Sequence, residues 1–341
     1  MKKLILGICG LALGASIGAC KKKDSGAALA DGAVTIGTAA AADEVEPNDR
    51  IEEANLINPG QPIRGRLRGP GGKPDLDHFR VVNREARGIL RAEVTGVPGL
   101  DLALDVIRLQ PRRKLATANN GKAGAGEVIP NVGVTPGEYV IVVRPAQKKA
   151  APVDSPYTLT VSLGPAGDGD ELEPNDVRID AQEIEAGKSV QGLFGRRGDV
   201  DWYRLKLPQT QSEAILRVEL TAVAGVPFVS LEVQDEIEVV LKKGRSGRGA
   251  GVLFPNVSVK PNQRFLYLAA SAGKGFNATD RYTLQTTLRP VAGLVEREPN
   301  DRPPKPRRCR WGSGCRGTSR PRATRTGLRS RPPSPPSHGS R

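Results

Sequence analysis

A short acidic segment, E-x-E-P-N-D, occurs three times and supplies a dense set of oxygen atoms. The copies begin at Glu44, Glu171 and Glu296, 127 and 125 residues apart. Ca²⁺ prefers about six to eight hard oxygen ligands from carboxylates, amide carbonyls and backbone. An Asp-x-Asp pair further along each of the first two repeats completes two predicted calcium sites. The predicted ligands are Glu44, Glu46, Asn48, Asp49, Asp75 and Asp77 in the first repeat, and Glu171, Glu173, Asn175, Asp176, Asp199 and Asp201 in the second.

Other interpretations of these acidic residues stay open at this point. Pro-Asn-Asp favours a solvated turn for backbone reasons alone, and the spacing lacks the strict order of an EF-hand loop. Paired carboxylates also serve as acid and base in glycosidases, but the same pair in every repeat favours a structural role. His78 follows Asp77, yet its counterpart is Trp202, which indicates a packed position rather than a catalytic one. We therefore predict that the protein is not an enzyme.

The segments that must position the acidic residues show the alternation of half-buried strands. Tyr157, Leu159 and Val161 alternate with polar residues, as do the apolar residues of 100–106 and 216–220. A period of two with one apolar face indicates β-strands, and Gly, Pro and Asn clusters separate them as in an antiparallel sandwich. The repeat length is that of a domain. We predict an all-β chain of tandem antiparallel jelly-roll-like β-sandwiches. The predicted boundaries are 44–164 and 171–289, with a third repeat starting at 296–301.

The two complete repeats align along their length and share an ordered set of motifs. Pro130-Asn-Val132 matches Pro255-Asn-Val257, and Asp75-Leu-Asp77-His-Phe79 matches Asp199-Val-Asp201-Trp-Tyr203. E-P-N-D, Gly-x-Leu, Gly-Asp-x-Asp-Trp-Tyr, Pro-Gly-x-Tyr and Tyr-x-Leu follow in that order. This order resembles the bacterial pre-peptidase C-terminal (PPC) domain, a family that includes the collagen-binding domains of collagenases. The resemblance implies a jelly-roll-like sandwich, usually appended to secreted proteases, and an acidic calcium segment with a later Asp pair. No protease segment accompanies the repeats here.

The N-terminus has the features of a lipoprotein signal peptide over residues 1–19. Two lysines precede the apolar run 4–18, and Ile17-Gly-Ala-Cys20 resembles the bacterial lipobox. That resemblance implies lipidation of Cys20, and several acyl chains hold a protein on a lipid bilayer. Residues 20–43 form the predicted tether, and Lys21 favours the outer over the inner membrane. The alternative is an ordinary signal peptide with a stray cysteine.

The net charge of +14 comes from the two ends of the chain. Eleven arginines and one lysine lie in residues 302–341 and five lysines in residues 1–23, so residues 24–301 are mildly acidic. We therefore expect no nucleic-acid partner for the folded part. Residues 302–341 are predicted to be a disordered basic tail and the product of a reading-frame slip. When the tail is back-translated and shifted, it can match residues 179–202, with G-D-x-D-W in register. The alternative is a true basic arm for polyanions.

These features predict a cell-envelope lipoprotein whose PPC-like domains act as non-catalytic binding or display modules. The alternative is an accessory or inhibitory partner of secreted peptidases. Ca²⁺ is the one cofactor expected. Besides the bilayer, the expected partners are an extracellular polysaccharide, a matrix protein or a secreted peptidase. A basic Gly-rich stretch in each repeat, at 112–122 and 242–248, is either a solvated hairpin or a contact for anionic polysaccharide.

Overall fold

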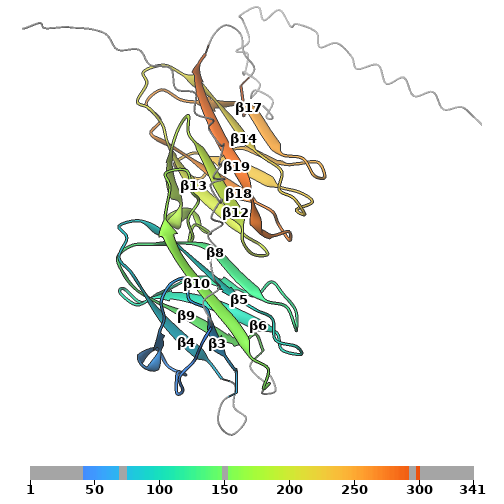
Figure 1. Cartoon of the computed structure of the whole chain (residues 1–341). Helices are drawn as coiled ribbons and strands as arrows, with labels where there is room; N and C mark the ends of the chain where they lie inside the picture. Colours follow the sequence, from blue (N-terminus) through green and yellow to red (C-terminus); the bar gives the residue numbers. More distant parts are fainter. Residues whose placement is uncertain (1–40, 69–74, 148–152, 292–296, 300–341) are drawn as a thin grey trace, which may run out of the picture.

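The computed structural model describes residues 41–68, 75–147, 153–291 and 297–299, and these form two β-sandwiches that follow each other along the chain (Figure 1). Within these ranges there is no α-helix, and no helix has the length and apolarity needed to cross a membrane. The predicted all-β fold class is confirmed. The predicted signal peptide, Cys20 and the basic tail lie outside the described residues.

Sandwich 1 consists of two five-stranded sheets, in the orders β1-β3-β10-β5-β8 and β2-β4-β9-β6-β7. Most neighbours are antiparallel, but the short edge strands β1 and β2 pair in parallel with β3 and β4. The elements are β1 (Ala42–Asp43), η1 (Ile51–Glu53), β2 (Asn55–Leu56), β3 (Ile63–Gly65), β4 (Asp77–Asn83), β5 (Gly88–Val94), β6 (Leu102–Arg108), β7 (Arg113–Ala118), β8 (Glu127–Val134), β9 (Gly137–Pro145) and β10 (Tyr157–Pro165).

Sandwich 2 repeats this arrangement with sheets in the orders β12-β19-β14-β17 and β11-β13-β18-β15-β16. No strand corresponds to β1, although an isolated parallel bridge between Asp170 and Gln191 occupies its place. The elements are η3 (Arg178–Asp180), β11 (Gln182–Glu185), β12 (Ser189–Phe194), β13 (Val200–Lys206), β14 (Ala214–Leu220), β15 (Ser230–Gln234), β16 (Val240–Arg245), β17 (Val252–Val259), β18 (Phe265–Ser271) and β19 (Asn277–Pro290).

Each sandwich encloses its own hydrophobic core, and the two clusters share no residue. The alternating residues Tyr157, Leu159 and Val161 of β10 are buried as predicted. Strand β6 departs from the predicted alternation, because Ala103 and Asp105 are buried as well as the apolar face. Asp105 accepts ionic hydrogen bonds from β7 and β9, so this carboxylate can stay charged inside the structure.

The two sandwiches are joined end to end through strand β8 (Figure 1). Glu173, in the second acidic segment, forms a parallel bridge with Val132 of β8. Gly133 N donates to Glu173 O over 2.8 Å, and Glu173 N donates to Asn131 O over 3.0 Å. The acidic segment of the second repeat is therefore bonded to the first sandwich as well as to its own.

Candidate cation-binding sites

Each acidic segment forms a turn that backbone hydrogen bonds fasten to its own sandwich. His78 N donates to Asn48 O over 3.0 Å, and Trp202 N donates to Asn175 O over 3.0 Å. The N–H of each asparagine in turn donates to the glutamate two residues earlier, at 2.9 and 2.8 Å. The Glu–Pro bond within the turn is cis in all three copies. These bonds hold the segment against the first residues of β4 and β13, where the Asp-x-Asp pairs lie.

A tyrosine from the last strand of each sandwich fixes the second aspartate of the pair. Tyr157 Oη donates to Asp77 Oδ2 in sandwich 1. The phenol lies directly over Gly65, where an added Cβ would be 2.2 Å from Tyr157 Oη. The glycine of the Gly-x-Leu motif is therefore required because any side chain would displace the tyrosine. The same arrangement in sandwich 2 consists of Gly192, Tyr282 and Asp201.

The structure brings most of the predicted ligands together. We call the first-repeat set site 1 and the second-repeat set site 2. In site 1, carboxylate oxygens of Glu44, Glu46 and Asp77 lie within 4.8 Å of one another. Asp49 accepts a 3.4 Å hydrogen bond from Leu76 N and lies beside Asp75, outside that trio. Site 2 contains two such trios that share Glu173: Glu171, Glu173 and Asp201, and Glu173, Asp176 and Asp199.

Several buried oxygen atoms at the two sites accept no hydrogen bond from the described protein. In site 1 they include Asn48 Oδ1 and Asp77 Oδ1, and in site 2 their counterparts Asn175 Oδ1 and Asp201 Oδ1. All four side chains are fully buried. A buried polar oxygen without a partner is costly. The same orphaned atoms at equivalent places in both sandwiches indicate a ligand that accepts electron pairs.

Burial and mutual repulsion raise the pKa values of these carboxyl groups. Burial, followed by the charge of Glu44, raises the pKa of Asp77 to about 9. Burial and the neighbouring Asp49 raise the pKa of Asp75 to about 7. In site 2, burial and the charge of Asp199 raise the pKa of Glu173 to about 8. Burial likewise raises the pKa values of Glu171 and Asp201 far above the ordinary range. Carboxylates in such surroundings need a countercharge to ionise.

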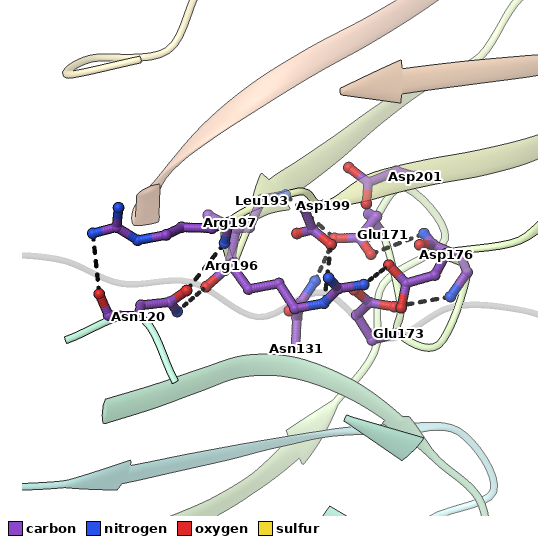
Figure 2. A network of polar contacts seen from close by, with 12 residues as sticks. Asn120, Asn131, Glu171, Glu173, Asp176, Leu193, Arg196, Arg197, Asp199 and Asp201 are labelled. Atoms are coloured by element: carbon purple, nitrogen blue, oxygen red, sulfur yellow. Dashed lines mark hydrogen bonds and ion pairs between the residues drawn. The ribbon is translucent and has the colours of Figure 1, made fainter. Parts of the chain in front are cut away.

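Site 2 is more enclosed than site 1 because sandwich 1 covers it (Figure 2). Asn131, from β8 of sandwich 1, donates through Nδ2 to Glu171 Oε2. Arg196 pairs with Asp176, and its Nε lies 3.6 Å from Asp199 Oδ1. The corresponding loop of site 1, residues 69–74, lies outside the described residues.

A cleft of about 430 Å³ lies beside site 2, between the two sandwiches. It is lined by Lys114 and Ala116 from β7, by Asn120 after that strand, and by Arg196 and Arg197 of sandwich 2. The basic stretches predicted as solvated hairpins or polysaccharide contacts form ion pairs at this end of each sandwich. Arg113 of the first stretch pairs with Asp180, and Lys242 of the second pairs with Glu298.

The prediction from sequence missed the contribution of sandwich 1 to site 2. Asn131 belongs to the Pro-Asn-Val motif, which was interpreted only as part of a strand. The repetition of this motif at Asn256 was the available signal, because a polar residue at the same strand position in both repeats is unexplained by packing. His78 is placed as expected: it is buried, and its Nδ1 lies 3.1 Å from Asn48 O and 3.0 Å from Leu76 O.

Comparison with known proteins finds only weakly similar solved structures. No protein-family model and no curated protein matches it significantly. One similar solved structure is the pre-peptidase C-terminal domain of collagenase from Bacillus anthracis, at 19% identity and a TM-score of 0.26. The match covers 34% of this chain and 100% of that domain. Similarity at this level does not assign the chain to a family.

A tandem domain and a triple jelly roll are also among the similar structures. The N-terminal CBM22-1–CBM22-2 tandem domain of Paenibacillus barcinonensis Xyn10C matches at 13% identity and a TM-score of 0.19, covering 69% of this chain and 88% of that one. A triple jelly roll from an archaeal virus matches at 11% identity and a TM-score of 0.26, covering 67% and 55%. Likeness at this level does not identify a ligand or an activity.

Proposed function

We propose that this chain is a tandem of non-catalytic β-sandwich binding modules, that Ca²⁺ occupies the acidic site of each module, and that lipidated Cys20 holds it at the cell envelope. The observation that carries the calcium assignment is the matched set of buried, unpartnered oxygens in both sandwiches. Carboxylate and amide oxygens are the ligands that Ca²⁺ prefers. Among the site 1 residues, Glu44, Glu46, Asn48 and Asp77 would hold the ion. In site 2 these are Glu171, Glu173, Asn175 and Asp201, with Asp176 and Asp199 alongside.

A divalent cation resolves the electrostatic problem that the sites present. At neutral pH each cluster must either keep protons on buried carboxyl groups or place several negative charges in close contact. A bound cation supplies the missing countercharge and accepts the free oxygen lone pairs. Because the ligands converge only in the folded state, binding stabilises the sandwich by RT ln(1 + [L]/Kd), about 2.7 kcal/mol at a hundredfold excess over Kd.

The same geometry favours binding over hydrolysis. His78 is the one histidine among the described residues, and its Nδ1 faces two backbone carbonyl oxygens. Carbonyl oxygens only accept, so Nδ1 carries a proton there, and the ring has no free base on that side. The second aspartate of each pair is held by a tyrosine that belongs to the core. Both features are those of a structural site.

Calorimetric titration of the full chain with Ca²⁺ tests this assignment. We expect two sites, with Asp77→Asn removing one and Asp201→Asn the other, and each loss lowering the melting temperature only when Ca²⁺ is present. Glu93→Gln and Glu219→Gln are matched controls, because these carboxylates lie on exposed faces of β5 and β14 and pair with arginines two residues away. Absence of heat and of any Ca²⁺-dependent melting shift would refute calcium binding.

The envelope location and the partner are tested separately. We expect Cys20→Ser to abolish partitioning of the mature protein into detergent. A binding panel of polysaccharides, collagen and secreted peptidases, with and without Ca²⁺, tests the role as a binding module. A mature protein without acylation that begins at another residue would contradict the anchor.

A further inference from the structure

We propose that site 2 is also the joint between the sandwiches: a cation bound there fixes their relative orientation, and docking of sandwich 1 in turn strengthens cation binding. This inference rests on the proposed binding of Ca²⁺ at site 2. The sequence places all the acidic ligands of site 2 in the second repeat, but the structure shows that the site is organised from both sides of the boundary between the sandwiches.

The backbone of the ligand segment is the first connection. Glu173 exchanges two hydrogen bonds with the edge of β8, through Asn131 O and Gly133 N. Glu173 is also a member of both carboxylate trios of site 2. Movement of sandwich 1 relative to sandwich 2 therefore either breaks these two bonds or displaces a ligand that both trios share.

The side chain of Asn131 is the second connection. Its Nδ2 donates to Glu171 Oε2, which also accepts a 3.2 Å hydrogen bond from Leu193 N of sandwich 2. The other oxygen, Oε1, accepts from Asn175 Nδ2 at 3.0 Å. The carboxylate of Glu171 is thus oriented by donors from both sandwiches, and Figure 2 shows Asn131 reaching it from β8.

Asn120 makes the third connection, to the loop of residues 195–197 beside site 2 (Figure 2). Its Nδ2 donates to Gly195 O over 3.1 Å, and its Oδ1 accepts from Arg197 N over 3.0 Å. Between these two bonded residues lies Arg196, the cation that pairs with Asp176 and approaches Asp199. Sandwich 1 therefore forms hydrogen bonds both with the acidic segment of site 2 and with the loop that carries Arg196.

The third acidic segment shows that this attachment is a repeated device. Glu298 N donates to Asn256 O over 2.9 Å, and Ser258 N donates to Glu298 O over 2.9 Å. The parallel bridge between Val257 and Glu298 on β17 reproduces the bridge between Val132 and Glu173 on β8. The second glutamate of the acidic segment thus pairs with the same strand position at both boundaries. Because the contact recurs, we interpret it as a specific interface.

Thermodynamic linkage makes the proposal measurable. If a cation at site 2 favours the docked arrangement, docking favours the cation by the same factor. Weakening the interface at a residue that touches no ligand must then weaken cation binding. Asn120 is such a residue, because its side-chain hydrogen bonds across the boundary go to Gly195 and Arg197, neither of which is a proposed ligand. Asn83 is the matched control: it is buried in the same sandwich, but its side-chain amide donates only to Glu85 within its own loop.

The experiment uses the full chain carrying Asp77→Asn, so that a Ca²⁺ titration reports site 2. We expect Asn120→Ala to weaken Ca²⁺ binding about three- to tenfold, the effect of losing one or two net hydrogen bonds, and Asn83→Ala to leave it unchanged. Arg113→Ala is a second variant with a milder effect, since it removes an exposed ion pair to Asp180 across the same boundary. Circular dichroism establishes that each variant is folded.

Distances between the sandwiches give an independent readout. Spin labels on Glu53→Cys and Lys274→Cys, both at exposed positions, report the spread of orientations once the native cysteines are replaced by serine. We expect Ca²⁺ to narrow the distance distribution, and to narrow it less in Asn120→Ala. If Asn120→Ala binds Ca²⁺ with normal affinity and the distance distribution does not change with Ca²⁺, the proposed joint is refuted. The calcium site itself is then unaffected. No Ca²⁺ binding in the parent would instead refute the proposed function, and the joint with it.

Discussion

Site 1 and site 2 are built from the same residue types in the same order, yet their surroundings differ. Glu44 is half-buried and Glu46 exposed, whereas Glu171 is 2% exposed and Glu173 is half-buried against β8. Site 2 has a second carboxylate trio and a paired arginine. The acidic segment therefore specifies where the ligands go within a sandwich, and the preceding sandwich determines how enclosed they become.

This difference matters for cation binding because enclosure changes both the cost of burying the carboxylates and the entropy cost of ordering their side chains. Burial raises the free-energy cost of unpaired carboxylates. A bound cation removes this cost, so it stabilises a buried site more than an exposed one. Donors from a second sandwich also fix the ligand side chains before the ion arrives, which reduces the ordering cost of binding. We therefore expect site 2 to bind Ca²⁺ more tightly than site 1, and three perturbations can sharpen or break that comparison.

The largest loss of stability and of Ca²⁺ binding is expected at the glycine that packs against the tyrosine in each site, where the two sites are most alike. An added Cβ at Gly192 would lie 2.2 Å from Tyr282 Cζ, and one at Gly65 would lie 2.2 Å from Tyr157 Oη. Gly192→Ala and Gly65→Ala should each destabilise their sandwich by about 1–3 kcal/mol, as overpacking does, and abolish Ca²⁺ binding there. Calorimetric melting checks this. Gly247→Ala, at an open position, is the control.

The pH dependence of folding stability should be next in size, and saturating Ca²⁺ should remove it. A raised carboxyl pKa stabilises the folded state below the ordinary value near 4 and loses that contribution as pH rises through the folded value. Without divalent cations, stability should therefore fall as pH rises through the pKa values of about 7 for Asp75, 8 for Glu173 and 9 for Asp77. Saturating Ca²⁺ should remove this decline. Melting curves from pH 5 to about pH 9 in chelator and in Ca²⁺ measure it, and a parallel pair of curves would contradict it.

The smallest change in Ca²⁺ affinity is expected when a residue of the second boundary, on β16, is introduced at the equivalent position of the first, on β7. Register places Ala116 on β7 where β16 has Lys242, since they pair with Val106 and Val233 respectively. Lys242 Nζ bonds Glu298 at 2.8 Å, whereas Ala116 lines the cleft beside Glu173. Ala116→Lys should bring an ammonium group to Glu173 and compete with the cation.

We expect Ala116→Lys to weaken Ca²⁺ binding at site 2 by no more than about fivefold, the range of a partly exposed ion pair. Thr160→Lys is the control, because it introduces the same charge on β10, outside the residues that line the cleft. Titration calorimetry in the Asp77→Asn background measures both. Equal effects of the two variants would indicate a general electrostatic change rather than competition at Glu173.

Much of each sandwich could be predicted from local sequence because strand alternation is a local property. The buried face of β10 and the pairing of the acidic segment with the Asp-x-Asp strand both follow from short-range patterns. The burial of Ala103 and Asp105 on β6 could not be predicted in this way. The burial of Asp105 depends on Lys114 and Arg144 from neighbouring strands, which neutralise the carboxylate. Such partners are set by register rather than by spacing.

The partner of Asn131 could not be predicted from the sequence for a related reason, although the repeated motif marked the position. Nothing in the order Pro-Asn-Val specifies a neighbour 40 residues away, and the contact exists only once two complete sandwiches are docked. The steric need for Gly65 is similar: the glycine is apparent in the sequence, but the tyrosine that would clash with any side chain there lies on the last strand. Alternation within a strand was predictable where one face is apolar, whereas contacts that depend on register or on docking of the sandwiches were not.

The paired bridges on β8 and β17 also bear on how such a chain can change in length. Each repeat carries a docking segment at its start and a receiving strand edge near its end, and the two boundaries use the same atoms. An in-frame duplication of one whole repeat therefore creates a new boundary whose backbone hydrogen bonds are already complementary. Deletion of one whole repeat preserves the remaining boundary for the same reason. This arrangement makes repeat number a variable that recombination can adjust without redesign of the interface.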